Sequence, residues 1–264
     1  MKNDSSWLEI TTKIGCKMNC VFCPQSTLVK KYESPERLMT LENFKKIIST
    51  IPKNILIHFS GYAEPFLNPA ASSMMVYAKK NGYNLALFTT LIGFDEKHAD
   101  LIKEINFNYI KIHVPDTIGM KIDEDLWIKN HDLFLKYNFK KAKYMAMGVV
   151  TEKIRNHLLN SILPSQTKRN SMISRAGLIE VKSKIQNKIL GPITCKSNKW
   201  HQNVVLPDGN VYLCCNDYGL TSKLGNLLNE DYSKIYEKGE EFKEKYKYDE
   251  NAICRYCEYA VAIK

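Results

Sequence analysis

Residues 7–23, WLEITTKIGCKMNCVFC, join a strand-like apolar run to three cysteines, Cys16, Cys20 and Cys23. Their spacing is Cys-x3-Cys-x2-Cys. A structural zinc site takes four ligands, and neither a histidine nor a fourth cysteine follows closely enough to complete one. Three thiolates suit a [4Fe-4S] cluster, because they leave one iron open for a small ligand. The spacing therefore predicts a catalytic iron–sulfur site in the loop after the first strand.

This loop resembles that of the radical S-adenosylmethionine (radical SAM) superfamily, whose members carry Cys-x3-Cys-x-aromatic-Cys after their first strand. Phe22 stands at the aromatic position. The resemblance implies that Cys16, Cys20 and Cys23 hold three irons and that the fourth iron binds the methionine moiety of SAM. It implies that SAM is cleaved to a 5′-deoxyadenosyl radical, which takes a hydrogen atom from the substrate. It also implies an electron donor such as flavodoxin or ferredoxin.

A second motif, Gly-Tyr-Ala-Glu-Pro at residues 61–65, follows the apolar run 54–59. Alone, such a motif is an ordinary turn. At about forty residues beyond the cysteine loop, it resembles the Gly-x-Gly-Glu-Pro segment of radical SAM enzymes, with Ala63 in place of the second glycine. That segment contacts the amino group of the SAM methionine. The resemblance implies SAM-binding roles for Phe22, Gly61, Tyr62 and Glu64.

Strands and helices alternate along the first 150 residues. Apolar runs predict strands at 7–12, 54–59, 84–89, 109–114 and 143–150, and helices begin near Thr40, Pro69, Asp95 and Asp123. This order predicts an α/β fold with right-handed βαβ units and a parallel sheet. It fits the partial (β/α)6 TIM-like barrel that the resemblance implies, with a sixth strand at 177–182. Ligands of such sheets lie at the carboxyl ends of the strands, where the chain has Thr89 and His113.

Thr89 and His113 are therefore further candidates for cofactor binding. His113 is either a structural histidine or a residue that lines the ribose of SAM.

The other five cysteines lie in the tail. The run 203–213 alternates apolar and polar residues around a Pro-Asp-Gly-Asn turn, which predicts a β-hairpin. Four thiolates from this hairpin and a terminal Cys-x2-Cys pair bind either zinc or an iron–sulfur cluster, and spacing leaves the choice open. The order resembles the twitch domain, a short form of the SPASM domain. The resemblance implies an auxiliary [4Fe-4S] cluster on Cys195, Cys214, Cys254 and Cys257.

Cys215 is then a surplus thiol, either a buried neighbour or an alternate ligand, and we favour the neighbour. We expect a radical SAM barrel over residues 1–190 and a small auxiliary domain, a β-hairpin plus helix, over residues 191–264.

The segment Ser174-Arg-Ala-Gly-Leu178 resembles a segment of the radical SAM 2-deoxy-scyllo-inosamine dehydrogenases, whose arginine contacts the substrate. The resemblance makes Arg175 the candidate catalytic residue and Glu9 an acidic residue that faces the barrel. Those enzymes carry Phe-Glu-Asp where this chain has Cys-Asn-Asp at 215–217. The implied reaction oxidises a hydroxyl of a sugar, cyclitol or nucleotide-sugar to a ketone, with the auxiliary cluster accepting one electron.

Two other reactions stay open. One is peptide modification by a maturase, although only Met1–Ser6 precedes the first strand and leaves no room for an N-terminal peptide-recognition domain. The other is sugar epimerisation, in which a thiol returns a hydrogen atom and Cys215 is the spare cysteine. A non-enzymatic zinc protein is disfavoured, because a three-thiol loop has no structural use.

The chain has 264 residues, with 38 basic and 28 acidic side chains and a net charge of +10. This charge suits nucleic acid or phosphate-bearing ligands, but the lysines are scattered and form no dense block. We therefore expect a small-molecule, carbohydrate-like substrate and no nucleic-acid partner.

The longest apolar run, 144–150, is far below the roughly 20 residues that span a bilayer, and the start lacks a secretory signal. We expect a cytoplasmic enzyme without a membrane partner.

Overall fold

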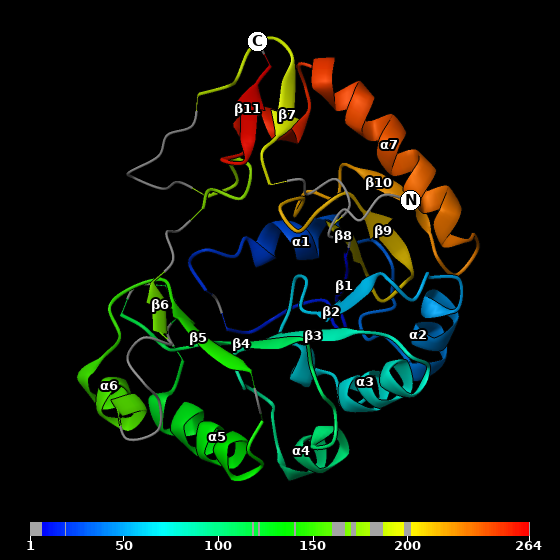
Figure 1. Ribbon diagram of the computed structural model, residues 1–264. Helices are drawn as coiled ribbons and strands as arrows, with labels where there is room; N and C mark the ends of the chain where they lie inside the picture. The colour runs from blue at the N-terminus through cyan, green and yellow to red at the C-terminus, as the bar shows by residue number, and fades with distance from the viewer. Residues whose placement is uncertain are drawn as a thin grey trace.

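The computed structural model describes residues 7–18, 20–117, 119–120, 122–139, 141–159, 167–169, 173–179, 187–197 and 202–263. Its frame is a curved nine-stranded sheet in the order β10-β9-β8-β1-β2-β3-β4-β5-β6 (Figure 1). Met1–Ser6, the segment proposed to precede the first strand, lies outside the described residues. Among the described residues, no helix has both the length and the apolar character needed to cross a bilayer.

Six strands form the parallel, barrel-like part of the sheet, as the alternation of the sequence predicts. Each pairs in parallel with the next along the chain. They are β1 (Trp7–Ile10), β2 (Leu56–Phe59), β3 (Leu85–Thr89), β4 (Tyr109–His113), β5 (Ala142–Ala146) and β6 (Thr167–Arg169).

Helices α2 to α6 lie along one face of this sheet (Figure 1). Apolar side chains of α2 and α3, such as Phe44 and Met74, pack against Leu8 and Ile57 of the strands in one continuous core. The shorter helix α1 follows the cysteine loop, and the short helix η1 follows β2. Their bounds are α1 (Gln25–Lys31), α2 (Leu41–Ile48), η1 (Pro65–Leu67), α3 (Ala71–Lys80), α4 (Glu96–Ile102), α5 (Glu124–Lys136) and α6 (Glu152–Leu159).

Side-chain caps fix the starts of three of these helices. Thr40, Asp95 and Asp123 each accept a hydrogen bond from the backbone N–H three residues ahead. Such a bond satisfies one of the N–H groups that a helix leaves unpaired at its start. The predicted starts near these three residues are confirmed.

The tail is built onto the same sheet. Strands β8 (Gln202–Val205) and β9 (Asn210–Tyr212) form the predicted hairpin, and β10 (Lys223–Asn226) extends it. Strand β8 also pairs in parallel with β1, from Trp7 opposite Gln202 to Ile10 opposite Val205. The remaining elements are β7 (Ile193–Cys195), α7 (Tyr232–Tyr248), η4 (Ile253–Tyr256) and β11 (Ala260–Ala262), with β7 and β11 paired antiparallel. The domain boundary after residue 190 stays a prediction.

The sixth strand differs from the prediction. It is Thr167–Arg169, paired with β5, and not 177–182. Residues 174–179 instead form turns, because Arg175, Ala176 and Gly177 have φ of 52°, 55° and 84°. Three consecutive left-handed residues cannot form an extended strand. Residues 180–182 of the predicted strand lie outside the described residues.

Candidate active site

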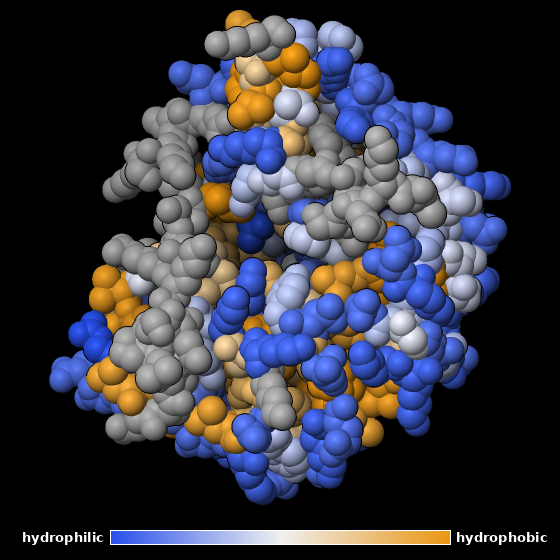
Figure 2. Space-filling model, in the orientation of Figure 1, coloured by the Kyte–Doolittle hydropathy of each residue, from blue (hydrophilic) through white to orange (hydrophobic). Residues whose placement is uncertain are grey.

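A cavity of about 630 Å³ opens between the barrel strands, the cysteine loop and the tail. A hollow is visible near the centre of the face in Figure 2, which elsewhere carries mostly hydrophilic side chains. The volume lies within the range of small-molecule sites, roughly 300–1,000 Å³. The cavity wall holds every residue predicted for the first cluster, SAM and catalysis: Cys16, Cys20, Cys23, Phe22, Gly61, Tyr62, Glu64, Thr89, His113 and Arg175.

The first three thiols form one group on this wall. Burial, followed by the charges of Cys23 and Cys16, raises the pKa of the Cys20 thiol to about 12. Burial raises the pKa of the Cys16 thiol as well, and the charges of Glu64 and Cys23 add to this shift. Three soft sulfur donors that face a roomy cavity fit a [4Fe-4S] cluster with one open iron. They do not complete the four-ligand shell of structural zinc.

Gln25 fastens the cysteine loop to the residue 61–65 motif. Its side-chain amide donates to the backbone oxygen of Tyr62 and to Cys23 Sγ, the latter at 3.2 Å. Its side-chain oxygen accepts from the backbone N–H of Cys16 at 3.2 Å. Sequence reasoning missed Gln25, whose one signal was its place two residues after the last cysteine of the loop.

Glu64 is buried and joins the end of β2 to the end of β3. One carboxylate oxygen accepts from Thr89 Oγ1 at 2.8 Å and from the Phe66 N–H at 3.2 Å. The other accepts from the N–H and the hydroxyl of Thr90 at 2.6 and 2.7 Å. A carboxylate has about four acceptor sites, so the chain itself occupies all of them. The contact of Glu64 with SAM stays a prediction, and the observed bonds give Glu64 a positioning role.

Gly61 has no room for a side chain. Its φ is +74°, and a Cβ there would overlap Thr11 Oγ1 and lie 3.1 Å from Thr11 Cβ. That same hydroxyl oxygen accepts from the Tyr62 N–H at 3.2 Å. Gly61 therefore lets the motif lie directly against the end of β1.

We expect Gly61→Ala to destabilise the protein and to weaken SAM binding, because the motif must move away from Thr11. The left-handed backbone costs about 1–2 kcal/mol, and the overlap adds about 1–3 kcal/mol. Gly82→Ala is the matched control, since Gly82 has φ +82° and nothing within 4 Å of the added Cβ. Thermal unfolding and SAM titration calorimetry compare the two variants. Equal effects of both would contradict the close approach at Gly61.

Phe22 and His113 lie next to each other in the cavity wall. Their rings stack with centroids 6.2 Å apart and an interplanar angle of 23°. Burial, followed by the charge of Arg175, lowers the pKa of His113 to about 4. The imidazole is therefore uncharged at physiological pH, and it presents a neutral ring that can still form hydrogen bonds to the cavity. Its contact with the ribose stays a prediction.

The other four predicted ligands, Cys195, Cys214, Cys254 and Cys257, line a separate small pocket. They come from the end of β7, the turn after β9, and the segment of η4. Burial, followed by the charges of Cys257 and Cys195, raises the pKa of the Cys254 thiol to about 12. Four converging sulfurs fit a metal centre whose ligands are all supplied by the protein. Burial, followed by the charge of Cys215, raises the pKa of the Cys214 thiol, so Cys215 is a neighbour of this set that also lines the large cavity.

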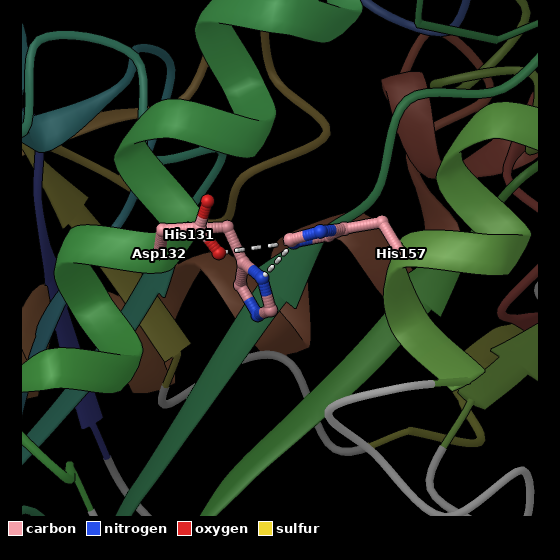
Figure 3. Close-up of side chains that lie close together, drawn as sticks. All are labelled: His131, Asp132 and His157. Carbon is pink, nitrogen blue, oxygen red and sulfur yellow. Dashed lines mark hydrogen bonds and ion pairs between the residues drawn. The ribbon is translucent and has the colours of Figure 1, made fainter.

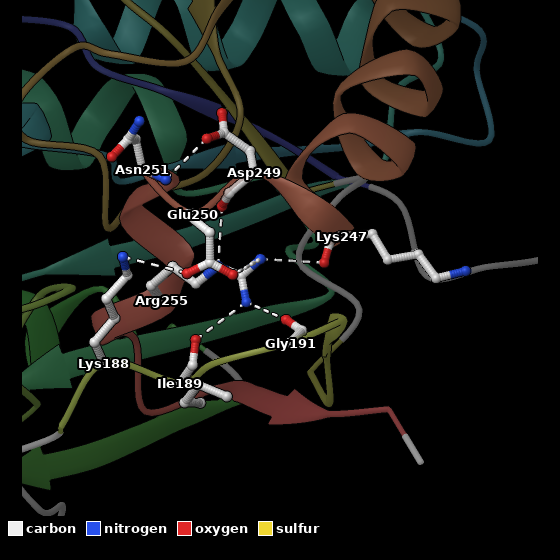
Figure 4. Close-up of polar contacts among 8 residues, drawn as sticks. All are labelled: Lys188, Ile189, Gly191, Lys247, Asp249, Glu250, Asn251 and Arg255. Carbon is white, nitrogen blue, oxygen red and sulfur yellow. Dashed lines mark hydrogen bonds and ion pairs between the residues drawn. The ribbon is translucent and has the colours of Figure 1, made fainter.

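Arg255 holds the terminal Cys-x2-Cys pair in place. It is fully buried within η4, between Cys254 and Cys257. A buried guanidinium must have its donors satisfied, and here backbone oxygens do so together with the partly exposed Glu250 at 3.7 Å. The accepting oxygens belong to Ile189, Gly191, Lys247 and Asp249 (Figure 4).

Arg175 connects the two thiol sets. Its Nε donates to the Phe22 backbone oxygen at 3.2 Å, inside the first cysteine loop. Its Nη1 donates to Asn216 Oδ1 at 3.2 Å, and Asn216 Nδ2 donates to Cys257 Sγ at 3.5 Å. One guanidinium thus contacts the first loop directly and the second set through one amide. Sequence reasoning missed Asn216.

Two tyrosines form a second connection. Tyr62 donates to the backbone oxygens of Cys214 and Asp217 at 3.1 and 3.0 Å. The Tyr218 hydroxyl and Cys23 Sγ share a hydrogen bond of 3.2 Å, and the two tyrosine rings lie 4.5 Å apart. Tyr218 carried no sequence signal of this role. The tail therefore completes the wall around the first cysteine loop.

Comparison with known families agrees with both thiol sets. A family model described as the radical SAM superfamily matches residues 10–160, which include the first cysteine loop and the residue 61–65 motif. A model of the SPASM iron–sulfur cluster-binding domain matches residues 195–258, which include all four thiols of the second set. No curated protein matches the chain in sequence.

Several solved structures share the fold. BtrN in complex with AdoMet and 2-DOIA has a TM-score of 0.63 and 17% identity over 94% of this chain and 89% of its own. The anSMEcpe structure with bound AdoMet has a TM-score of 0.60 and 20% identity over 96% of this chain and 83% of its own. Streptococcus suis SuiB bound to precursor peptide SuiA has a TM-score of 0.61 and 12% identity over 88% of this chain and 65% of its own. At these identities the likeness concerns the fold alone.

Proposed function

Because the chain belongs to the radical SAM superfamily and carries a SPASM iron–sulfur domain, we propose that it oxidises a substrate hydroxyl to a ketone. The observation that carries this proposal is the link through Arg175, which touches the first cysteine loop and, through Asn216, the second thiol set. A substrate in the large cavity lies beside the first set, and Arg175 with Asn216 connects that cavity wall to the second set. When bound, SAM and its cluster supply the radical that removes a hydrogen atom, and the auxiliary cluster takes up one electron.

The chain's own residues handle the remaining proton. Oxidation of a carbinol removes one hydrogen atom, one electron and the hydroxyl proton. We assign Arg175 to stabilise the negative charge that develops on the substrate oxygen as its proton leaves. Glu9 is the candidate acceptor of that proton, because it lies in the cavity wall as predicted. Its carboxylate is held by Trp7 Nε1 and by the Ser60 hydroxyl, both at 3.2 Å.

The polar groups of the wall favour a polyhydroxy substrate. Besides Glu9 and Arg175, the cavity is lined by Lys111, Lys196 and Glu258. Donors and acceptors distributed around a pocket of this size suit a sugar, cyclitol or nucleotide-sugar, whose hydroxyl groups both donate and accept. Among the similar structures, BtrN is in complex with a small molecule, 2-DOIA, and SuiB is bound to a precursor peptide, SuiA. The alternative substrate is a peptide, which the enzyme would modify as a maturase.

Epimerisation is the second candidate reaction, and the position of Cys215 favours it. This thiol follows Cys214 directly in the chain and lies in the wall of the large cavity, where none of the four thiols of the second set is found. A thiol at the substrate can return a hydrogen atom to a carbon radical, which restores the formula of the substrate with an inverted centre. The thiyl radical left on the sulfur then takes up one proton and one electron, which comes from the external electron donor.

Product mass in heavy water separates the two reactions. With a panel of sugars, cyclitols and nucleotide-sugars, we expect a product two mass units lighter than its substrate and without solvent deuterium. Cys215→Ala should retain most of this ketone formation, because no thiol hydrogen enters the product. A product of unchanged formula with one deuterium, lost in Cys215→Ala, would overturn the oxidation in favour of epimerisation. Mass change on a peptide substrate would instead support the maturase.

A further inference from the structure

Three side chains of types that can bind a metal ion meet between α5 and α6, on the outer helical layer. They are His131 and Asp132 of α5 and His157 of α6 (Figure 3). Their nearest ligand atoms all lie within 4.8 Å of one another. His131 Nδ1 is 2.8 Å from His157 Nε2, which is 3.7 Å from Asp132 Oδ1. None of the three lines the cavity of the proposed active site.

His131 is held in one orientation. Its ring is fully buried and stacks on Trp127, with centroids 4.8 Å apart and an interplanar angle of 10°. Its Nε2 shares a hydrogen bond of 3.0 Å with the Tyr144 hydroxyl on β5. Its other nitrogen, Nδ1, therefore points to His157. A metal-bound histidine commonly has its second nitrogen fixed by such an outer partner.

The cluster is open to solvent on one side. The side chains of Asp132 and His157 are 62% and 16% exposed. An ion can therefore reach the site, and water can complete its coordination. The buried His131 lies at the inner end of the cluster, and Asp132 and His157 lie at its solvent-exposed side.

We propose that His131, Asp132 and His157 bind one zinc-class divalent cation, which joins α5 to α6. Two imidazole nitrogens and one carboxylate oxygen are a donor set that zinc uses, with water as the fourth ligand. Zinc–nitrogen bonds of about 2.0–2.1 Å place two such nitrogens about 3.3 Å apart in a tetrahedral site. His157 must then move outward by about 0.5 Å from its hydrogen bond with His131. The exposed Asp132 carboxylate, whose oxygen is 3.7 Å from His157 Nε2, must move inward to the same ion. This inference does not depend on the proposed reaction.

Zinc titration of the holoenzyme tests the site. The protein with both clusters assembled is treated with zinc chloride under argon, desalted, and analysed for zinc, iron and thermal unfolding. We expect one zinc per chain at unchanged iron content, and a higher unfolding temperature. His157→Gln and Asp132→Ala should lose this zinc. Tyr144→Phe should keep it with affinity weakened about 10–100-fold, because only the outer partner is removed.

The matched control is Asp125→Asn. It removes another contact between the same helices, the 2.6 Å ion pair of Asp125 with Lys153, and leaves the three ligands intact. It should bind zinc like the unmodified protein. If His157→Gln fails to fold, Asp132→Ala decides, because its exposed side chain can be removed without a cavity. No bound zinc, or equal zinc in all variants, would overturn the proposal, since equal zinc would mean binding at thiols.

Discussion

Replacing Cys16, Cys20 and Cys23 together by alanine should leave about four of about eight irons per chain and abolish SAM cleavage. These three thiols share the wall of the large cavity, whereas the other four line a separate pocket. The second set should therefore keep its cluster. Iron and sulfide analysis after anaerobic reconstitution measures the first effect. Chromatography of 5′-deoxyadenosine, with dithionite as the reductant, measures the second.

Cys215→Ala is the control for this triple variant, because we assign its thiol to neither ligand set. It should retain about eight irons and normal SAM cleavage. Unmodified protein that binds only four irons, with zinc on the tail cysteines, would contradict the assignment of two [4Fe-4S] clusters. Persistent SAM cleavage in the triple variant would contradict the assignment of the first three thiols.

Cys254→Ala should separate SAM cleavage from product formation. The variant keeps the first cysteine loop and its contacts with Gln25, so 5′-deoxyadenosine should still form. The substrate radical, however, loses its electron acceptor. We expect the ratio of ketone to 5′-deoxyadenosine to fall from about one toward zero. Cys195→Ala removes a ligand from a different element, β7, and should give the same result.

The iron content of the Cys254→Ala protein shows which cluster the variant has lost. A Cys254→Ala protein with about four irons has lost the auxiliary cluster alone. Undiminished ketone formation by that protein would rule out the auxiliary cluster as the acceptor. Loss of 5′-deoxyadenosine together with most iron would show instead that the tail contacts around Tyr62 and Tyr218 are needed to keep the first site intact.

The parts of the site that are local in sequence could be predicted. The thiols Cys16, Cys20 and Cys23 lie within one loop, so their spacing alone singles them out, and the residues before them have the pattern of a strand. The alternation of strands and helices similarly predicted the parallel sheet, whose carboxyl ends place Thr89 and His113 at the cavity. Helix starts at Thr40 and Asp95 followed from capping chemistry.

The contacts between distant segments could not be predicted. Gln25, Asn216 and Tyr218 act through partners that only the folded chain brings near them. The position of Cys215, beside Cys214 and in the cavity wall, was also beyond sequence reasoning, because Cys215 lies in a turn after β9 where no strand alternation applies. The sixth strand was misplaced because an arginine and an alanine adopt left-handed φ at 175 and 176, which their residue types do not favour.

The pairing of β1 with both β2 and β8 imposes an order on folding during synthesis. About 140 residues separate β2 from β8, and ribosomes add about 5–20 residues per second, so β1 keeps one open edge for roughly 7–28 s. An open strand edge is a template for pairing with other nascent chains. Throughout this interval the first cysteine loop also lacks the cover of Tyr218. Until the tail docks, the nascent chain therefore exposes the first three thiols and an open strand edge at the same time.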